Sequence, residues 1–365
     1  MKRIKIFVTA LLVLFTIGCK EQTTINFINP SALPCKIIFN QHHYYKEGVL
    51  FFALQEDQFV YSKIVSYLVK AQQELETIFY IPFEEGRIDE IDINSHYLTF
   101  SILKKDGEAI LQEIYLYNIE EKSRPKKIVS YSRDYNTIFP LHVTLSDEAL
   151  FWIYQDNIEN KSRVYVYDFE FKQSSLIVTN SFTTEGFGPS ILFLAAHNGI
   201  LFHDQMEDGR YRIGAYDLSE KKYQSWFPLP REHKINFKAN YNKERGTLLL
   251  YGEAAEGDIL YELDITTGFI QKYINFTNNA RIYRDNIQLA WGGIYYPVQL
   301  QSLKIAPQFF FIEYYDFKSK TTTRQKGFDV VASTEYFATL SFTSSNFEDG
   351  VTFKLERQNK KAKFK

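Results

Sequence analysis

A short run of consecutive apolar residues returns along this chain at a regular interval. Each run follows a turn-forming residue pair and contains residues of the kind that fill buried strands. Seven such runs occur, about 47 to 50 residues apart. They lie at 49–52, 97–100, 149–152, 200–203, 247–250, 294–296 and 336–339.

A second pattern follows the first at a similar spacing. Apolar and polar residues alternate, the segment ends in an acidic or amide residue, and a polar turn comes next. The clearest copies end at Asn118, Asp168, Asp217, Asp264 and Asp316. The alternation predicts a half-buried strand, and the turn predicts a hairpin that leads into a further strand. With an earlier strand at positions such as 141–144, each repeat supplies four short strands.

Four short antiparallel strands per repeat, repeated radially, are typical of a β-propeller. We therefore predict an all-β chain with a single propeller over residues 35–365. Seven four-stranded blades fit the repeats best, and six or eight are the alternatives. The outer strand of the last blade has two candidates: residues 361–365, or residues 24–28, which would close the ring and remove its exposed edges.

The beginning of the chain has the pattern of an export signal. Three basic residues lie among the first five, and residues 6–15 are apolar apart from Thr9. These features match the charged and apolar regions of a secretory signal. The apolar run is too short for a membrane-spanning helix, which takes about 20 residues. We therefore expect the protein to be exported.

Residues 16–19, Thr-Ile-Gly-Cys, resemble the lipobox of bacterial lipoproteins, although Thr16 stands where Leu is usual. The resemblance implies a lipoprotein signal peptide at 1–18, lipid on Cys19, and a lipidated tether at 19–34. Two acyl chains would give durable membrane anchoring. An ordinary signal peptide with a chance cysteine is the alternative.

Two stretches look like the blade motifs of TolB-like and related six- to eight-bladed propellers, namely residues 146–151 and 260–268. Such motifs mark a blade and its turns and carry no chemistry. The combination of a lipid anchor with a propeller also resembles the BamB family, lipoproteins of the outer-membrane barrel-assembly machinery. That resemblance implies a role in outer-membrane protein assembly. Lys20 follows the cysteine where an inner-membrane retention signal would have Asp, which favours the outer membrane.

The net charge bears on which partners the chain can bind, and the cysteine content bears on whether it can form a disulfide. The chain has 42 Lys and Arg against 44 Asp and Glu, a net charge of −2, so nothing indicates a nucleic-acid partner. With Cys19 lipidated, Cys35 is left without an intramolecular partner. The fold must therefore rest on its apolar core.

The motifs of common catalytic and metal sites are absent from the sequence. His42 and His43 are adjacent, and adjacent side chains on a strand point to opposite faces. The densest polar group is His203 and Asp204 near Glu207 and Asp208, but it lacks the spacing of a calcium loop. We interpret residues 206–210 as a solvated hairpin turn and predict no catalytic residue, metal or cofactor.

Two connections rich in Gly, Pro and aromatic residues are candidate contact loops, at 185–189 and 227–231. A rigidly held exposed aromatic side chain can anchor a partner at low entropic cost. The candidate contact residues are Phe187, Phe227, Leu229 and Arg231. Packing of these loops against their own blade is the alternative.

These patterns favour a non-enzymatic, membrane-anchored scaffold of the bacterial cell envelope that binds another protein. Its partners would be the membrane, through lipid on Cys19, and an envelope protein. A second hypothesis is a tethered hydrolase or lyase acting on glycans or peptides, which would need convergent acidic or histidine side chains in the central channel. A third is capture of a small ligand in an aromatic-lined pocket.

Overall fold

The computed structural model describes the strands and most of the turns between them. The described residues are 22–26, 43–46, 49–57, 60–68, 76–82, 84–94, 96–133, 142–156, 159–181, 191, 194–207, 209–242, 245–254, 257–276, 280–282, 288–290, 293–300, 310–326, 329–332, 336–342 and 351–357. They form β-strands and connecting turns, with no helix among them. Four residues singled out above lie outside the described ones: Cys19, Cys35, His42 and Phe187. His43 is described.

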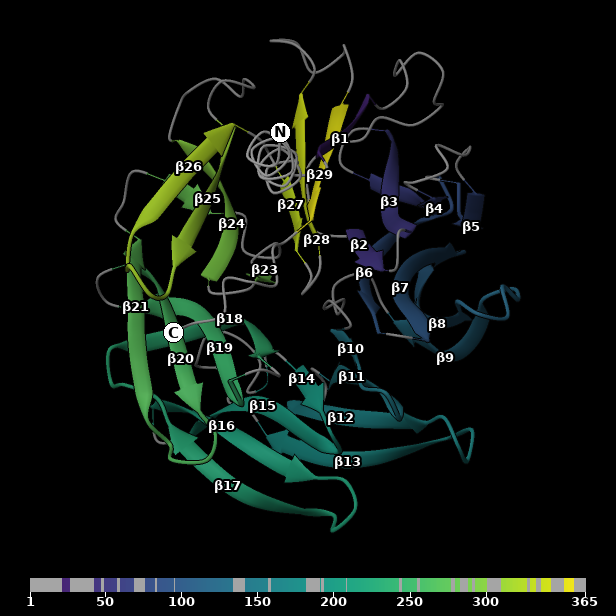
Figure 1. The fold of residues 1–365 in the computed structure, drawn as a ribbon. Helices are drawn as coiled ribbons and strands as arrows, with labels where there is room; N and C mark the ends of the chain where they lie inside the picture. The colour runs from purple at the N-terminus through teal and green to yellow at the C-terminus, as the bar shows by residue number, and fades with distance from the viewer. Residues whose placement is uncertain are drawn as a thin grey trace, which may run out of the picture.

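The strands form antiparallel sheets arranged radially around a centre (Figure 1). Blade 1 consists of β2 (His43–Lys46), β3 (Val49–Asp57), β4 (Val60–Leu68) and β5 (Glu76–Tyr80), and blade 2 of β6 (Gly86–Ile93), β7 (Tyr97–Asp106), β8 (Ala109–Asn118) and β9 (Lys126–Arg133). Blade 3 consists of β10 (Val143–Leu145), β11 (Ala149–Asp156), β12 (Lys161–Asp168) and β13 (Gln173–Ser181), and blade 4 of β14 (Leu194–His197), β15 (Ile200–Glu207), β16 (Arg210–Asp217) and β17 (Lys222–Pro228). Blades 1 and 2 are joined into one eight-stranded sheet by a single residue pair, Tyr61 with Ile88.

The remaining strands complete the ring. Blade 5 consists of β18 (His233–Asn242), β19 (Thr247–Ala254), β20 (Gly257–Asp264) and β21 (Ile270–Phe276). Blade 6 consists of β22 (Ala280–Ile282), β23 (Gln288–Ala290), β24 (Gly293–Leu300), β25 (Phe310–Asp316) and β26 (Thr322–Lys326). Blade 7 consists of β27 (Asp329–Ala332), β28 (Tyr336–Phe342), β29 (Val351–Arg357) and β1 (Gln22–Asn26). When the eight-stranded sheet is divided at its single pair, the described strands make seven units of four, with β23 additional. Every one of the seven apolar runs lies at the start of the second strand of such a unit.

The first strand of the chain closes the ring. β1 pairs antiparallel with β29, and the register runs from Gln22 beside Glu356 to Asn26 beside Thr352. The earlier of the two candidate segments for the outer strand therefore takes this place. β1 falls within 19–34, the segment assigned above to a tether, so part of that segment belongs to the last sheet.

In blades 2 to 5 the second strand buries residues on both of its faces, because a blade has neighbours on both sides. In β11, Phe151 packs in a cluster with Leu201 of the next blade. Its neighbour Trp152 packs in a separate cluster with Ile114 of the preceding blade. Both β11 side chains are at most 1% exposed. Two-sided burial explains why these strands are continuous apolar runs rather than alternating ones.

Five third strands end in the same turn. Its first residue is Asn or Asp, and the side-chain Oδ1 accepts hydrogen bonds of 2.7–3.1 Å from the backbone N–H groups two and three residues later. The fourth residue after it has a positive φ of 49–73° in every copy. These turns begin at the five residues of the second sequence pattern: Asn118, Asp168, Asp217, Asp264 and Asp316.

These side-chain hydrogen bonds also explain why an acidic residue recurs at the position. Hydrogen bonds from the turn backbone hold the pKa of the Asp217, Asp264 and Asp316 carboxyl groups below the ordinary value. We call the end of the ring that carries these five turns the Asx-turn face.

Within the described residues, no helix is long and apolar enough to cross a membrane.

Removing β1 should weaken the ring measurably. We expect a chain that starts at residue 27 to unfold about 3–4 °C below one that starts at residue 20, because β29 loses its pairing partner and about 2–3 kcal/mol of stability. Both chains lack the acyl group, so lipid does not enter the comparison. Thermal unfolding followed by circular dichroism measures the difference, and equal midpoints would show that β1 does not support the fold.

Candidate functional site

The innermost strand of blade 2, β6, carries three acidic residues and a β-bulge. Its register with β7 shifts between Ile88 and Glu90, which leaves Asp89 as the extra residue of the bulge. Ile88 and Ile91 are buried in the core cluster that blades 1 and 2 share. Bulges re-aim side chains and recur near functional sites. Asp89, Glu90 and Asp92 are therefore the best candidates for polar chemistry near the centre of the ring.

Two of these carboxylates hold the innermost strand of the next blade. Glu90 Oε2 accepts a hydrogen bond of 3.0 Å from the N–H of Val143, and Asp92 Oδ2 accepts one of 2.8 Å from the N–H of Leu145. The two bonded pairs have the same sequence offset, so β6 and β10 run in parallel. Because β10 has no strand partner on that side, these carboxylates satisfy backbone donors that would otherwise lack one.

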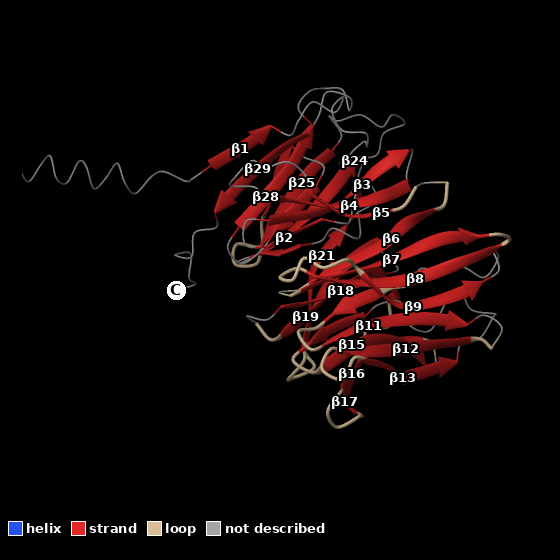
Figure 2. Ribbon diagram, turned by 90° about the vertical axis from the view of Figure 1, so that its right-hand side faces the viewer, coloured by secondary structure: helices blue, strands red, loops and turns tan. Residues whose placement is uncertain are grey.

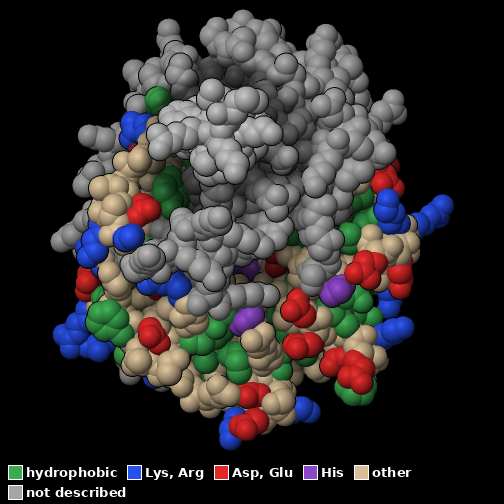
Figure 3. All heavy atoms as spheres, viewed as in Figure 1, with side chains coloured by type: hydrophobic (Ala, Val, Ile, Leu, Met, Phe, Trp, Pro, Cys, Tyr) green, Lys and Arg blue, Asp and Glu red, His purple; other side chains and the backbone are tan. Residues whose placement is uncertain are grey.

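His142 completes the polar cluster. Its Nδ1 lies 2.6 Å from Glu90 Oε1, and both side chains are about one-third exposed or less, at 32% and 26%. Acidic and histidine side chains also gather near the centre of the described face in Figure 3. Glu90 thus bridges the backbone of β10 and an imidazole immediately before that strand.

Asp89 differs from its neighbours in its proton affinity. Burial raises the pKa of Asp89 to about 6, and the adjacent Glu90 carboxylate adds to the rise, while Arg87 and His142 act in the opposite direction. Within the described part of the chain, no hydrogen bond to the Asp89 carboxyl group is present. Chemically, such a group can carry a proton near neutral pH or meet a cationic ligand.

The polar group around His203 and Asp204 takes a structural place. Both residues lie in β15 and are fully buried, at 0% exposure. His203 Nδ1 lies 3.0 Å from the backbone oxygen of Asp204 and Nε2 lies 2.7 Å from the Tyr223 hydroxyl. The first bond requires a proton on Nδ1, so Tyr223 donates to Nε2. Burial lowers the pKa of His203 to about 4, which keeps the ring neutral.

The hairpin predicted at 206–210 is confirmed for its described part, since β15 ends at Glu207, Gly209 has a φ of 69°, and β16 begins at Arg210. His203 and Asp204 lie inside the core, away from that turn. The described residues contain no group of three or more His, Cys, Asp or Glu that could hold a metal ion.

Aromatic rings enclose His203. The Tyr223 and Trp226 rings lie 5.6 and 5.8 Å from its ring. Gly214, opposite His203 in the sheet, permits this packing, because a Cβ there would approach the two aromatic rings to 2.9–3.0 Å. The arrangement is a packed aromatic cluster.

Two buried glutamates are held by side chains of their own blades. Glu113 accepts hydrogen bonds of 2.8 Å from the Tyr115 hydroxyl and 2.9 Å from Lys127 Nζ. Glu262 lies 2.5 Å from the Thr247 hydroxyl and 2.8 Å from Arg245 Nε. Both glutamates are at most 4% exposed, so these contacts compensate for the loss of water around the charge.

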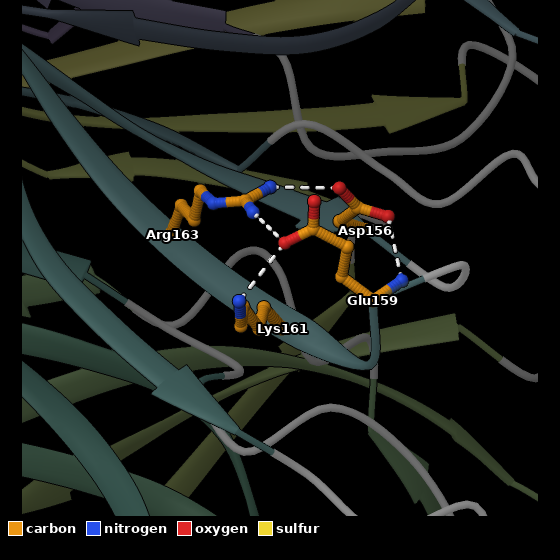
Figure 4. Close-up of polar contacts among 4 residues, drawn as sticks. All are labelled: Asp156, Glu159, Lys161 and Arg163. Atoms are coloured by element: carbon orange, nitrogen blue, oxygen red, sulfur yellow. Dashed lines mark hydrogen bonds and ion pairs between the residues drawn. The ribbon is translucent and has the colours of Figure 1, made fainter.

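The hairpin between β11 and β12 carries an ion network, drawn in Figure 4. Arg163 contacts Asp156 at 2.7 Å and Glu159 at 2.5 Å, and Lys161 reaches Glu159 at 2.9 Å. Glu159 is 49% exposed. The two pairs that involve Glu159 are open to solvent and contribute little to stability, whereas the side chains of the Arg163–Asp156 pair are only 17% and 18% exposed.

The candidate contact loops are placed differently from one another. Phe227 and Leu229 are 8% and 4% exposed and pack in the core cluster between blades 4 and 5. The N–H of Leu229 also donates to the backbone oxygen of Tyr211 at 2.9 Å. These two residues therefore pack against their own blade, the alternative given above. Arg231 is exposed, and Phe187 lies outside the described residues.

Comparison with known proteins bears on the fold alone. No family model matches the chain, and no curated protein sequence matches it. The solved oligogalacturonate lyase of Vibrio parahaemolyticus is similar over 94% of this chain and 99% of its own, with 9% identity and a TM-score of 0.54. A chain of the mitotic checkpoint complex is similar over 93% and 91%, with 10% identity and a TM-score of 0.53.

The chain has the β-propeller fold. The β-propeller domain of the trilobed protease of Pyrococcus furiosus also matches, over 76% of this chain and 82% of its own, with 8% identity and a TM-score of 0.47. The sheet arrangement and the two structures with TM-scores above 0.5 confirm the predicted all-β propeller. Identities this low transfer no activity or partner.

Sequence reasoning missed the acidic strand β6. The signal was present, because residues 89, 90 and 92 are acidic while 88 and 91 are apolar within one short segment. The bulge that sets Asp89 apart depends on pairing with β7, and the bonds to β10 depend on the ring. Neither can be read from local periodicity.

The raised pKa predicts a pH-dependent stability. Between about pH 4 and pH 6 the folded chain holds a proton on Asp89 that the unfolded chain has lost, so stability falls as pH rises through this window. Asp89→Asn removes the effect. We expect the variant to gain about 1–3 kcal/mol relative to the natural protein between pH 4 and pH 7.

Urea unfolding at several pH values measures this difference. Asp106→Asn, at an exposed residue of β7, is the matched control and should show no such trend. A stability difference for Asp89→Asn that stays constant with pH would contradict the assignment.

Proposed function

We propose that this protein is a membrane-anchored, non-enzymatic binding scaffold of the bacterial cell envelope, made as a lipoprotein with acyl chains on Cys19. One observation carries the proposal: the chain enters the ring at Gln22, where β1 closes the last blade, three residues after that cysteine. The anchor would thus join directly to a closed ring. Such a ring is a rigid support for contact with another protein.

The polar interior of the described blades supports a structural role. Glu90 and Asp92 bond the backbone of the next blade, Glu113 and Glu262 are held within their own blades, and His203 is buried and neutral. The contacts of Glu90 and Asp92 fix blade 2 against blade 3, and the other contacts stiffen individual blades. A stiff ring loses little conformational freedom when it binds, which favours affinity.

The partner of the scaffold would be an envelope protein, and outer-membrane protein assembly in the manner of the BamB family is the most concrete version. The acidic side chains near the centre, Asp89 above all, match a partner segment that carries Lys or Arg. The sequence after the cysteine favours the outer membrane as the place of anchoring.

Affinity purification from native membranes in mild detergent tests this function. We expect the tagged protein to bring down a stoichiometric outer-membrane assembly protein, and the Cys19→Ala variant to lose both the membrane and that partner. Mass spectrometry identifies the partner and the acylated cysteine. Intact, acylated protein that brings down no envelope protein would rule out the stable scaffold.

The raised pKa of Asp89 favours a second function, a tethered hydrolase or lyase on glycans or peptides. A carboxyl group that keeps its proton to about pH 6 can act as a general acid. Turnover would then fall above pH 6, and Asp89→Asn would reduce it by about 10²-fold or more. Asp106→Asn should leave it unchanged, and equal turnover by both variants would exclude Asp89 as the acid.

A further inference from the structure

The start of β1 lies at the Asx-turn face. Gln22 pairs with Glu356, next to the last residue of β29, Arg357. β29 is the third strand of its blade, and the third strands of blades 2 to 6 end at the Asx turns. In Figure 2 the arrows of β1 and β9 both point to the right, so both strands begin at the same end of the ring.

Cys19 is separated from this point by very little chain. Three peptide steps join it to Gln22, and an extended chain spans at most about 3.6 Å per residue. Acyl chains on Cys19 would therefore hold the start of β1, at one edge of the Asx-turn face, within about 11 Å of the bilayer surface. A tether reaching from 19 to 34 would have allowed the ring to turn freely.

The Asx-turn face carries side chains that suit a bilayer surface. Phe171 and Phe269 each stand 66% exposed, one in the turn of blade 3 and one in the turn of blade 5. Exposed aromatic rings are typical of protein segments that lie in the interfacial layer of a bilayer. Their turns occupy equivalent positions in their blades, so both rings project from the same end of the ring.

The turns also carry lysines, beside the aspartates that begin four of them. Counted from the residue that begins each turn, segments 118–124, 168–172, 217–222, 264–269 and 316–320 carry seven Lys and Arg against four Glu and four Asp. Four of the five residues with positive φ in these turns are lysines: Lys122, Lys172, Lys221 and Lys320. The charges of the five turns therefore nearly cancel and give no net attraction to anionic lipid headgroups, so the exposed aromatic rings are the feature that suits this face to a bilayer.

We propose that the Asx-turn face docks on the bilayer that holds the acyl chains, with Phe171 and Phe269 in the headgroup layer. The inference rests on the proposed lipidation of Cys19. In this orientation the opposite end of the ring faces away from the membrane and toward a partner. That end carries the hairpins that join second to third strands.

Site-specific fluorescence on the full lipoprotein tests the orientation. Phe171→Cys, Phe269→Cys and the control Met206→Cys are each made with Cys35→Ser and labelled with an environment-sensitive dye, since acylated Cys19 cannot react. Met206 is 42% exposed and lies near the hairpin at the opposite end. The proteins are reconstituted on phosphatidylcholine–phosphatidylglycerol vesicles that contain a headgroup-nitroxide lipid, and flotation is recorded in parallel.

We expect the labels at 171 and 269 to lose most of their emission to the lipid quencher and the label at 206 to keep it. Flotation with equal quenching at all three positions, or with none, would overturn the docking alone. Protein that fails to float, with unmodified Cys19 by mass, would overturn the anchor and the docking together. The two failures are therefore distinguishable.

Discussion

The pairing of β1 with β29 is the interaction on which the rest of the structure depends. Five residues from the beginning of the chain complete a blade whose other strands come from its end. A ring closed in this way leaves no blade without neighbours, so every second strand can bury both faces. It also fixes where the chain leaves the ring, and hence where an anchor on Cys19 would hold it.

Contacts between blades then make the ring rigid. Apolar clusters join neighbouring blades across blades 1 to 6, and successive residues of one strand, such as Phe151 and Trp152, belong to different clusters. Carboxylates of β6 add polar contacts to β10 near the centre. A rigid support with a fixed point of attachment fits the proposed scaffold better than a loosely tethered domain does.

Much of the fold could be predicted from the sequence, because one local feature recurs in all seven blades and a second recurs in five of them. The apolar runs mark strands buried on both faces, and the Asn or Asp that ends a third strand accepts two hydrogen bonds within its own turn. The short innermost strands were harder to predict, since β10 has only three residues. The candidate site was missed because Asp89 is set apart by a register shift, and Phe227 and Leu229 were offered as contacts although they fill the core.

Hydrogen exchange of the mature, unlipidated protein tests ring closure most directly. If β1 closes the ring, the backbone amides of 22–26 that face β29 exchange slowly, and protection appears at the same time in the amides of 351–357. Exchange of residues 22–26 at the rate of an unstructured peptide, with 351–357 still protected, would contradict closure by β1 and the placement of the anchor that follows from it.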